Sequence, residues 1–218
     1  MGMVITIDGP AASGKSSVSR ELARRLGWNW VSTGAFYRGL AYVALQKKID
    51  LSDVGSLVNL ISDPIWSVKL TPQKTSVIFN GQDVTEQIAF EEVGNYASKI
   101  SHYSEVRQRL LNNQRVLSDG PEGLIAEGRD CGTVVFPQAN VKIYLTASSE
   151  NRAARRAAEL GMEQQELVEA QKKRDEQDST RKAAPLQIPE NALVLDSTSL
   201  SLNEVVNQVE VFVKNKLN

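Results

Sequence analysis

The sequence predicts an α/β fold in which a five-stranded parallel sheet has helices on both faces. Most of the five apolar runs are rich in β-branched residues without clear alternation, which is typical of parallel strands covered on both sides. Helical patterns separate several of these runs, as crossover connections between parallel strands require. A long stretch with a different periodicity interrupts them and predicts a small α+β insert. The five runs are Val4–Asp8, Trp28–Ser32, Leu124–Glu127, Val141–Leu145 and Ala192–Asp196.

Composition narrows the class of protein. Of the 218 residues, 41% are hydrophobic and 23% are charged, as in ordinary globular domains. The net charge of −1 gives no general attraction to nucleic acid or to an anionic membrane. Cys131 is the single cysteine and His102 the single histidine, which excludes an internal disulfide and argues against a histidine metal site or a Ser-His-Asp triad. No signal peptide and no apolar run of about 20 residues is visible, so we expect a cytoplasmic protein.

A phosphate-binding pattern, G-x-x-x-x-G-K-[ST], runs from Gly9 to Ser16, directly after the first predicted strand. Glycines let the backbone N–H groups approach phosphates, Lys15 can reach the β- and γ-phosphates, and the Ser16 hydroxyl can ligate Mg²⁺. An apolar helical stripe begins at Val18, so a bound anion would lie at a helix N-terminus. An ordinary Gly/Ser turn between strand and helix is the alternative. The pattern therefore predicts an ATP site formed by Gly9, Pro10, Ala11, Ala12, Ser13, Gly14, Lys15, Ser16 and Ser17.

The insert is predicted between the second and third apolar runs. Two helical patterns come first, and the second ends at Asp63-Pro64. The periodicity then changes to two, and Asn80-Gly81 is a strong signal for a hairpin turn. The predicted elements are helices at Tyr37–Lys47 and around Val54–Ile61, strands at Trp66–Leu70 and Thr75–Phe79, and helices at Glu91–Ile100 and Glu105–Leu117.

Two charged helices are predicted after the fourth apolar run. In the second of them, Arg174, Asp178 and Arg181 are spaced i, i+4 and i+7 and share one face. A solvated helix with intrahelical ion pairs, each contributing about 0.2–0.5 kcal/mol, is the alternative. A phosphoryl-transfer site needs clustered cations, which favours a functional role. The predicted C-terminal helices are Ser149–Leu160, which carries Arg152, Arg155 and Arg156, then Glu163–Lys182 and Leu202–Val213.

Charged residues also follow two predicted strands, at the sheet edge where open α/β folds bind ligands. Glu127 ends the third strand and can hold magnesium-bound water, while Arg129 and Asp130 can contact an acceptor molecule. Arg38 follows the second strand and can clamp an acceptor phosphate through two hydrogen bonds. A solvent-exposed ion pair and a simple helix start are the respective alternatives.

A phosphate-binding loop alone is compatible with a kinase, a GTPase switch, a motor or a ligase. The guanine-reading Asn-Lys-x-Asp motif is absent, and no Asp-x-x-Gly switch motif occurs. The chain is also small for a motor. Transfer of a phosphoryl group to a small acceptor is therefore the leading class.

Several segments together carry a family resemblance that extends from Val4 to about Leu217. Gly-Arg-Asp and Arg-Asp-x-x-Asp-x-x-Arg are the most specific of its motifs. The segments are Ile7–Ser16, Thr33–Arg38, Gly128–Pro137, Lys142–Ser148, Arg174–Leu186 and Leu195–Thr198. With them the sequence resembles the bacterial cytidylate (CMP) kinases, a branch of the nucleoside monophosphate (NMP) kinases.

The resemblance implies a monomer with three parts: a CORE of residues 1–32, 85–148 and 186–218, an NMP-binding insert of residues 33–84 or as far as about residue 100, and a LID of residues 149–185. It implies transfer of the ATP γ-phosphoryl group to CMP or dCMP with Mg²⁺. By position, Ser98, Arg107 and Asp130 would read the cytosine ring, and Thr33 would lie near the bound CMP at a position that is often Ser in the family. Arg174 and Asp178 would hold the sugar hydroxyls, and Arg38, Arg129 and Arg181 would hold the CMP phosphate or the transferring group. Lys15, Arg129, Arg174 and Arg181 are then the candidate catalytic residues.

Two rival readings stay open at this point. One is a kinase for another small acceptor, such as shikimate, AMP or UMP. The other is a nucleotide-dependent switch or regulatory ATPase without a small acceptor, which would leave the insert and the arginine-rich helix without a role.

Overall fold

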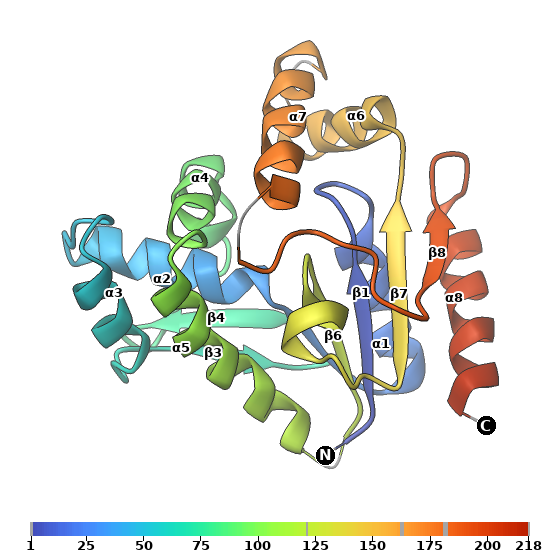
Figure 1. Ribbon diagram of the computed structural model, residues 1–218, viewed down its shortest axis with the longest axis horizontal. Coiled ribbons are helices and arrows are strands. Elements are labelled where there is room, and N and C mark those ends of the chain that lie inside the picture. Colours follow the sequence, from blue (N-terminus) through green and yellow to red (C-terminus); the bar gives the residue numbers. More distant parts are fainter. Residues whose placement is uncertain (1, 121, 162–163, 181–182, 218) are drawn as a thin grey trace.

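A parallel sheet forms the centre of the molecule. The computed structural model describes residues 2–120, 122–161, 164–180 and 183–217. Within these ranges five strands pair in the order β2-β6-β1-β7-β8 (Figure 1), which confirms the predicted sheet. Each predicted run forms one strand, and the boundaries differ from the predicted ones by at most one residue at either end. The strands are β1 Val4–Asp8, β2 Asn29–Ser32, β6 Leu124–Gly128, β7 Val141–Thr146 and β8 Leu193–Asp196.

The strand β1 is central, and all five of its residues are buried. Its last residue, Asp8, lies opposite Gly128 of β6, and Ser32 at the end of β2 lies opposite Glu127. Because parallel strands end at the same edge, this register brings three loops together. The loop after β1, the loop after β2 and the loop after β6 therefore meet at one place.

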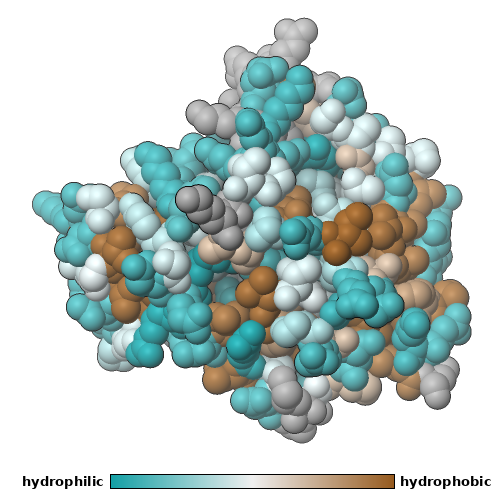
Figure 2. All heavy atoms as spheres, viewed as in Figure 1, coloured by the Kyte–Doolittle hydropathy of each residue, from teal (hydrophilic) through white to brown (hydrophobic). Residues whose placement is uncertain are grey.

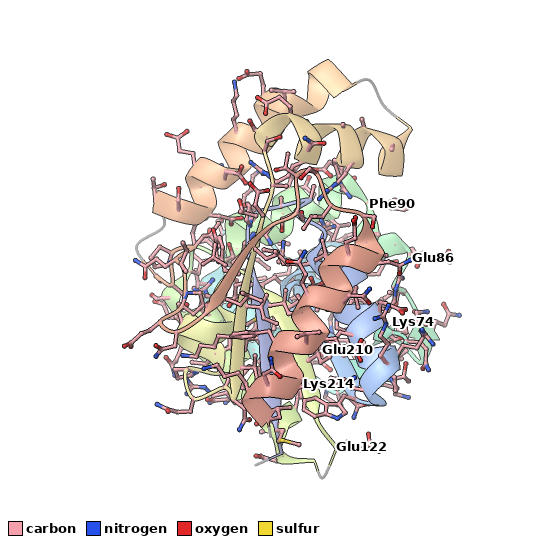
Figure 3. The ribbon with its side chains drawn as sticks, turned by 90° about the vertical axis from the view of Figure 1, so that its right-hand side faces the viewer. Lys74, Glu86, Phe90, Glu122, Glu210 and Lys214 are labelled. Carbon is pink, nitrogen blue, oxygen red and sulfur yellow. The ribbon has the colours of Figure 1, made fainter. Side chains whose placement is uncertain are left out.

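Helices cover both faces of the sheet, as predicted. On one face α1 (Lys15–Leu26) and α8 (Leu202–Leu217) contribute Leu22 and Val209 to a cluster with Ile7 of β1. On the other face lie α2 (Gly34–Gln46), α4 (Glu91–Ile100) and α5 (Ser104–Arg115). Figure 3 shows α8 beside the sheet with Glu210 labelled on it, and this carboxylate accepts a 2.9 Å hydrogen bond from Arg25 of α1.

The insert consists of α3 (Val54–Ile61) and a small antiparallel sheet of β3 (Trp66–Leu70), β4 (Thr75–Phe79) and β5 (Gln82–Asp83). The predicted turn at Asn80-Gly81 joins β4 to β5, with positive φ angles of 50° and 77°. The Thr75 hydroxyl donates to the Trp30 carbonyl at 2.9 Å and accepts from Ser32 N at 3.0 Å, which fastens this sheet to β2. The insert also shares one hydrophobic cluster with α4 and α5. The boundaries of a separate NMP-binding domain stay a prediction.

Two helices, α6 (Ser149–Leu160) and α7 (Gln164–Thr180), stand together above the edge where the strands end (Figure 1). Figure 2 shows mainly hydrophilic residues over α7 at the top of the molecule. Ser148 begins α6 by accepting a 3.2 Å hydrogen bond from Asn151 N, and Gly161 ends it with a φ of 64°. The predicted bounds of α7, Glu163 and Lys182, lie outside the described residues.

Some boundaries differ from those the sequence predicts. The helix α2 begins at Gly34, three residues before Tyr37, and α8 continues to Leu217. Short helical turns occur at Gln87–Ala89, at Val116–Asp119 and, in π-helical form, at Cys131–Val135. None of the helices within the described ranges combines the length and apolar character that a bilayer-spanning segment needs.

Candidate functional site

The carboxyl ends of β1, β2 and β6 open into a cavity of about 310 Å³, which helices α2, α4, α5, α6 and α7 also border. The cavity gathers most of the site residues that the sequence predicts. Those that line it are Ala11, Ala12, Gly14, Lys15, Ser16, Ser17, Thr33, Arg38, Ser98, Arg107, Glu127, Arg129, Asp130 and Asp178.

The phosphate-binding loop has the backbone that its glycines predict. Gly9 has a φ of 150°, and a Cβ at this position would lie 2.0 Å from the Leu145 carbonyl oxygen. Gly14 has a φ of 91° and directly precedes α1, and the first residues of that helix, Lys15, Ser16 and Ser17, line the cavity. Gly9, Pro10 and Ser13 shape the loop without lining the cavity.

Lys15 is almost fully buried in this loop, with 6% of its surface exposed. Its ammonium group donates to the Pro10 carbonyl at 2.6 Å and to Ser13 Oγ at 3.4 Å. Burial, together with the nearby positive charge of Arg129, lowers the pKa of Lys15 from 10.5 to about 7. An anionic ligand would favour the charged form, so this side chain is suited to bind phosphate oxygens.

Ser16 and Glu127 face each other across the loop. The Ser16 hydroxyl donates to Glu127 Oε1 at 2.7 Å. Glu127 is 3% exposed, and its other carboxylate oxygen, Oε2, has no hydrogen-bond partner among the described residues. A hydroxyl beside a buried, unsatisfied carboxylate oxygen is a donor set that suits a hard cation such as Mg²⁺.

The three residues predicted to read the base come from separate elements and meet at the cavity. Arg107 of α5 forms an ion pair with Asp130, which follows β6, and each side chain is 10% exposed. The Arg107 guanidinium also lies 5.6 Å from the centre of the Tyr37 ring. Ser98 of α4 donates to Gln177 Oε1 of α7 at 3.3 Å. Donors and acceptors from three separate segments of the chain thus line the cavity.

The residues predicted to hold the sugar and the phosphate are described only in part. Arg129 forms an ion pair with Asp178 of α7 at 2.6 Å. Burial of the guanidinium group lowers the pKa of Arg129, but the negative charge of Asp178 outweighs this effect, so the pKa lies above its ordinary value. Arg38 donates to the Ile88 and Phe90 carbonyls at 2.7 and 3.1 Å. Arg174 belongs to α7, but its side chain lies outside the described part of the chain, as does all of Arg181.

The Thr33 hydroxyl is buried and hydrogen-bonded to the protein itself. Thr33 is 4% exposed and donates to the Glu127 carbonyl at 2.9 Å, while its own N–H donates to the same oxygen at 3.0 Å. Thr33 therefore lines the cavity beside β6 and also places a polar group there.

The three arginines of α6 contact different parts of the protein, which their spacing in the sequence does not predict. Arg156 lines the cavity and pairs with Glu91 of α4 at 2.7 Å. Arg152 is buried, donates to the Ala11 carbonyl of the loop at 3.2 Å and pairs with Asp175 at 2.7 Å. Arg155 donates to the Ser197 carbonyl at 2.7 Å.

A parallel sheet with a Gly-Lys-Ser phosphate loop, joined to a polar cavity beneath a helical pair, defines a P-loop kinase. The family model described as cytidylate kinase matches residues 5–215. The chain belongs to the cytidylate kinase family, which confirms the resemblance seen in its motifs.

Two relatives and two solved structures illustrate the match. The chain is 68% identical to the cytidylate kinase of Bdellovibrio bacteriovorus over 217 residues, with both chains covered in full. It is 42% identical to that of Aeromonas hydrophila, covering 100% of this chain and 96% of the relative. A gluconokinase from Sinorhizobium meliloti aligns with a TM-score of 0.53 at 13% identity, over 98% of this chain and 92% of that one. A shikimate kinase from Bacteroides thetaiotaomicron aligns with a TM-score of 0.50 at 10% identity, over 97% and 98%. These two structures share the fold.

Proposed function

We propose that the chain transfers the γ-phosphoryl group of ATP to CMP or dCMP, giving the nucleoside diphosphate and ADP. One observation carries the proposal: a phosphate-binding loop and a separate set of base-matching side chains line the same cavity. Membership in the cytidylate kinase family supports CMP as the acceptor.

The loop of Gly9–Ser17 would hold the phosphates of ATP. Its backbone N–H groups and the N-terminus of α1 favour anions, and Lys15 would contact the β- and γ-phosphates. Ser16 would bind Mg²⁺ directly, and Glu127 would bind it directly or through a water molecule. When bound, Mg²⁺ neutralises the charge of the phosphates and orients them.

The other side of the cavity would bind CMP. Ser98, Arg107 and Asp130 would satisfy the hydrogen-bonding edge of cytosine, with Thr33 beside the nucleotide. A site built from such polar groups rejects a base that leaves them unpaired. Arg174 and Asp178 would hold the sugar hydroxyls. Arg38, Arg129 and Arg181 would hold the acceptor phosphate or the group in transfer.

The reaction needs positioning and charge neutralisation more than a general base. Lys15 and the arginines would surround the transferring phosphoryl group, with the attacking oxygen of CMP and the leaving oxygen of ADP roughly in line. Residues 149–185 would act as a LID and residues 33–84, or as far as about residue 100, as the NMP-binding insert. Their closure would exclude water and suppress hydrolysis of ATP.

The test is a coupled assay of ADP release with CMP, dCMP, UMP, AMP, GMP and shikimate as acceptors. We expect the highest kcat/KM with CMP or dCMP. A preference for shikimate, AMP or UMP, or slow ATP hydrolysis that no acceptor changes, would contradict the proposal.

Two variants test the roles of the cations. Lys15→Ala and Arg181→Ala are each expected to lower kcat by orders of magnitude, because each removes positive charge from the transferring group. Arg24→Ala is the matched control, since Arg24 is an exposed arginine that pairs with Glu21 on α1. Near-normal kcat in Lys15→Ala would remove that residue from the mechanism, and an Arg181→Ala result equal to the control would assign Arg181 to a solvated helix face.

The monomeric state is part of the same proposal. Light scattering of the purified protein would test it, and a dimer mass would contradict it. The cytoplasmic location stays a prediction, which fractionation of the producing cells would test.

A further inference from the structure

Asp8 is a buried carboxylate that the proposed reaction does not use. It is the last residue of the central strand β1, it has no exposed surface, and Gly9 of the phosphate-binding loop follows it directly. Its Oδ1 accepts from Cys131 N at 2.8 Å and its Oδ2 accepts from Gly132 N at 2.7 Å. Both carboxylate oxygens are thus bound to the backbone of a segment more than 120 positions away in the sequence.

The segment that Asp8 holds begins immediately after Asp130. Cys131 and Gly132 open the π-helical turn Cys131–Val135, whose first N–H groups have no acceptor within the turn itself. Asp8 supplies those acceptors from a neighbouring strand. At the other end of the turn, Arg115 of α5 donates to the Val134 and Val135 carbonyls at 2.8 and 2.9 Å. The backbone that carries Arg129 and Asp130 is therefore fixed on the side that faces the phosphate-binding loop.

The closeness of this contact depends on a glycine. A Cβ at Gly132 would lie 2.7 Å from Thr6 Oγ1, 2.9 Å from Pro189 Cγ and 3.2 Å from Asp8 Oδ2. The first two of these distances are shorter than the contacts that Cβ atoms make in folded proteins, so a neighbour would have to shift. The turn can thus lie against β1 only because position 132 has no side chain.

We propose that Asp8 is a positioning residue, whose carboxylate fixes the Arg129–Asp130 segment of the acceptor site relative to the phosphate-binding loop. The inference rests on the proposed function, because it assigns Arg129 and Asp130 to the acceptor. It explains how one strand end can set the distance between the donor phosphates and the acceptor.

The ionisation of Asp8 is consistent with a role other than stability. Burial raises the pKa of Asp8 from 3.8 to about 6, although the hydrogen bonds from the two N–H groups lower it. The negative charge of Asp130 raises this pKa further, and the positive charge of Lys15 lowers it. Between these two values the folded protein binds the proton more tightly than the unfolded chain does, so the free energy of unfolding falls as the pH rises. Stability alone therefore does not account for a carboxylate at this position.

The variant Asp8→Asn tests the proposal, because asparagine has the same shape but its NH₂ group cannot accept a hydrogen bond. One of the two N–H groups then loses its acceptor and the turn shifts. We expect kcat/KM for CMP to fall about 10- to 100-fold through a rise in the KM for CMP, while the KM for ATP changes less than about 2-fold, since Lys15 and the loop remain. Discrimination between CMP and UMP should weaken at the same time.

One control separates positioning from general destabilisation. Val209→Ala destabilises α8 on the far side of the sheet, and should lower the melting temperature without separating the two KM values.

The outcome with Asp8→Asn decides the proposal. Unchanged kinetics with CMP, an equal rise in both KM values, or the same pattern in Val209→Ala would overturn it. If Asp8→Asn does not fold, Gly132→Ala displaces the same turn with the carboxylate intact, and normal kinetics with CMP in that variant would overturn the proposal. If the wild-type protein prefers another acceptor, the proposed function fails. The role of Asp8 is then tested by comparing the KM for that acceptor with the KM for ATP in Asp8→Asn.

Discussion

Lys15 should make the protein less stable in its unliganded form than a variant that lacks the charge. The pKa of this buried lysine is lowered from 10.5 to about 7, mainly by burial. At pH 6 the free-energy cost of keeping it protonated in the fold is about 5 kcal/mol, from about 1.4 kcal/mol per pKa unit. Lys15→Met keeps the volume and removes the charge, but loses the two hydrogen bonds to Pro10 and Ser13, which contribute about 1–2 kcal/mol. We expect Lys15→Met to be about 3 kcal/mol more stable than wild type at pH 6.

The sign of the pH dependence follows from the same values. Between pH 7 and 10.5 the unfolded chain binds the Lys15 proton and the folded protein does not, so the free energy of unfolding of the wild type rises with pH in this window. The cost of the charge falls to about 2 kcal/mol at pH 9. The advantage of Lys15→Met should therefore shrink as the pH is raised.

The assay is urea unfolding of both proteins at pH 6 and pH 9, in buffers without phosphate or nucleotide. Lys47→Met is the matched control, because Lys47 is 36% exposed and its ion pair with Asp63 lies at the surface, where such pairs add little stability. The variant Lys15→Met should have lost turnover while gaining stability. Equal stability of Lys15→Met and wild type at pH 6, or a difference that does not change with pH, would refute the reasoning.

Three further predictions concern the acceptor, the cation and the insert. Asp130→Ala removes the partner of Arg107 and should reduce the kcat/KM preference for CMP over AMP at least about 10-fold in the coupled assay; an unchanged preference contradicts the assignment. Glu127→Gln should raise the Mg²⁺ concentration for half-maximal activity about 10-fold, measured by titration at fixed ATP, whereas an unaltered Mg²⁺ curve would exclude this carboxylate. Gly39→Ala would place a Cβ 2.9 Å from Trp66 Cζ3 and should lower the free energy of unfolding, measured with urea, by about 1–3 kcal/mol. Wild-type stability of this variant would show that the Trp66 side chain moves aside at no cost.

The strands and the phosphate-binding loop were predictable because their signals are local. A β-branched run such as Val4–Asp8 specifies a buried strand, and the spacing from Gly9 to Ser16 specifies a phosphate loop, without reference to distant residues. The confirmed strand order brings the ends of β1, β2 and β6 together, so the place of the site followed from the fold class.

The acceptor side was not predictable from local patterns. In the sequence, Ser98 of α4 and Arg107 of α5 look like solvated helix residues. Ser98 contacts Gln177, and Arg107 pairs with Asp130, only after those helices pack. They entered the prediction through the family resemblance alone. Asp8 gave no signal either, since a single acidic residue at the end of an apolar run is compatible with any strand end.

The central place of β1 has a consequence for the order in which the chain gains structure. Its neighbours in the sheet begin at Leu124 and Val141, so during synthesis β1 stays without a pairing partner for more than a hundred residues. Pairings this distant in sequence make folding slow and leave an apolar segment open to chaperones and to aggregation. The phosphate-binding loop directly follows β1, and its Gly9 lies against the Leu145 carbonyl of β7, so the loop can take its final shape only after β7 has emerged.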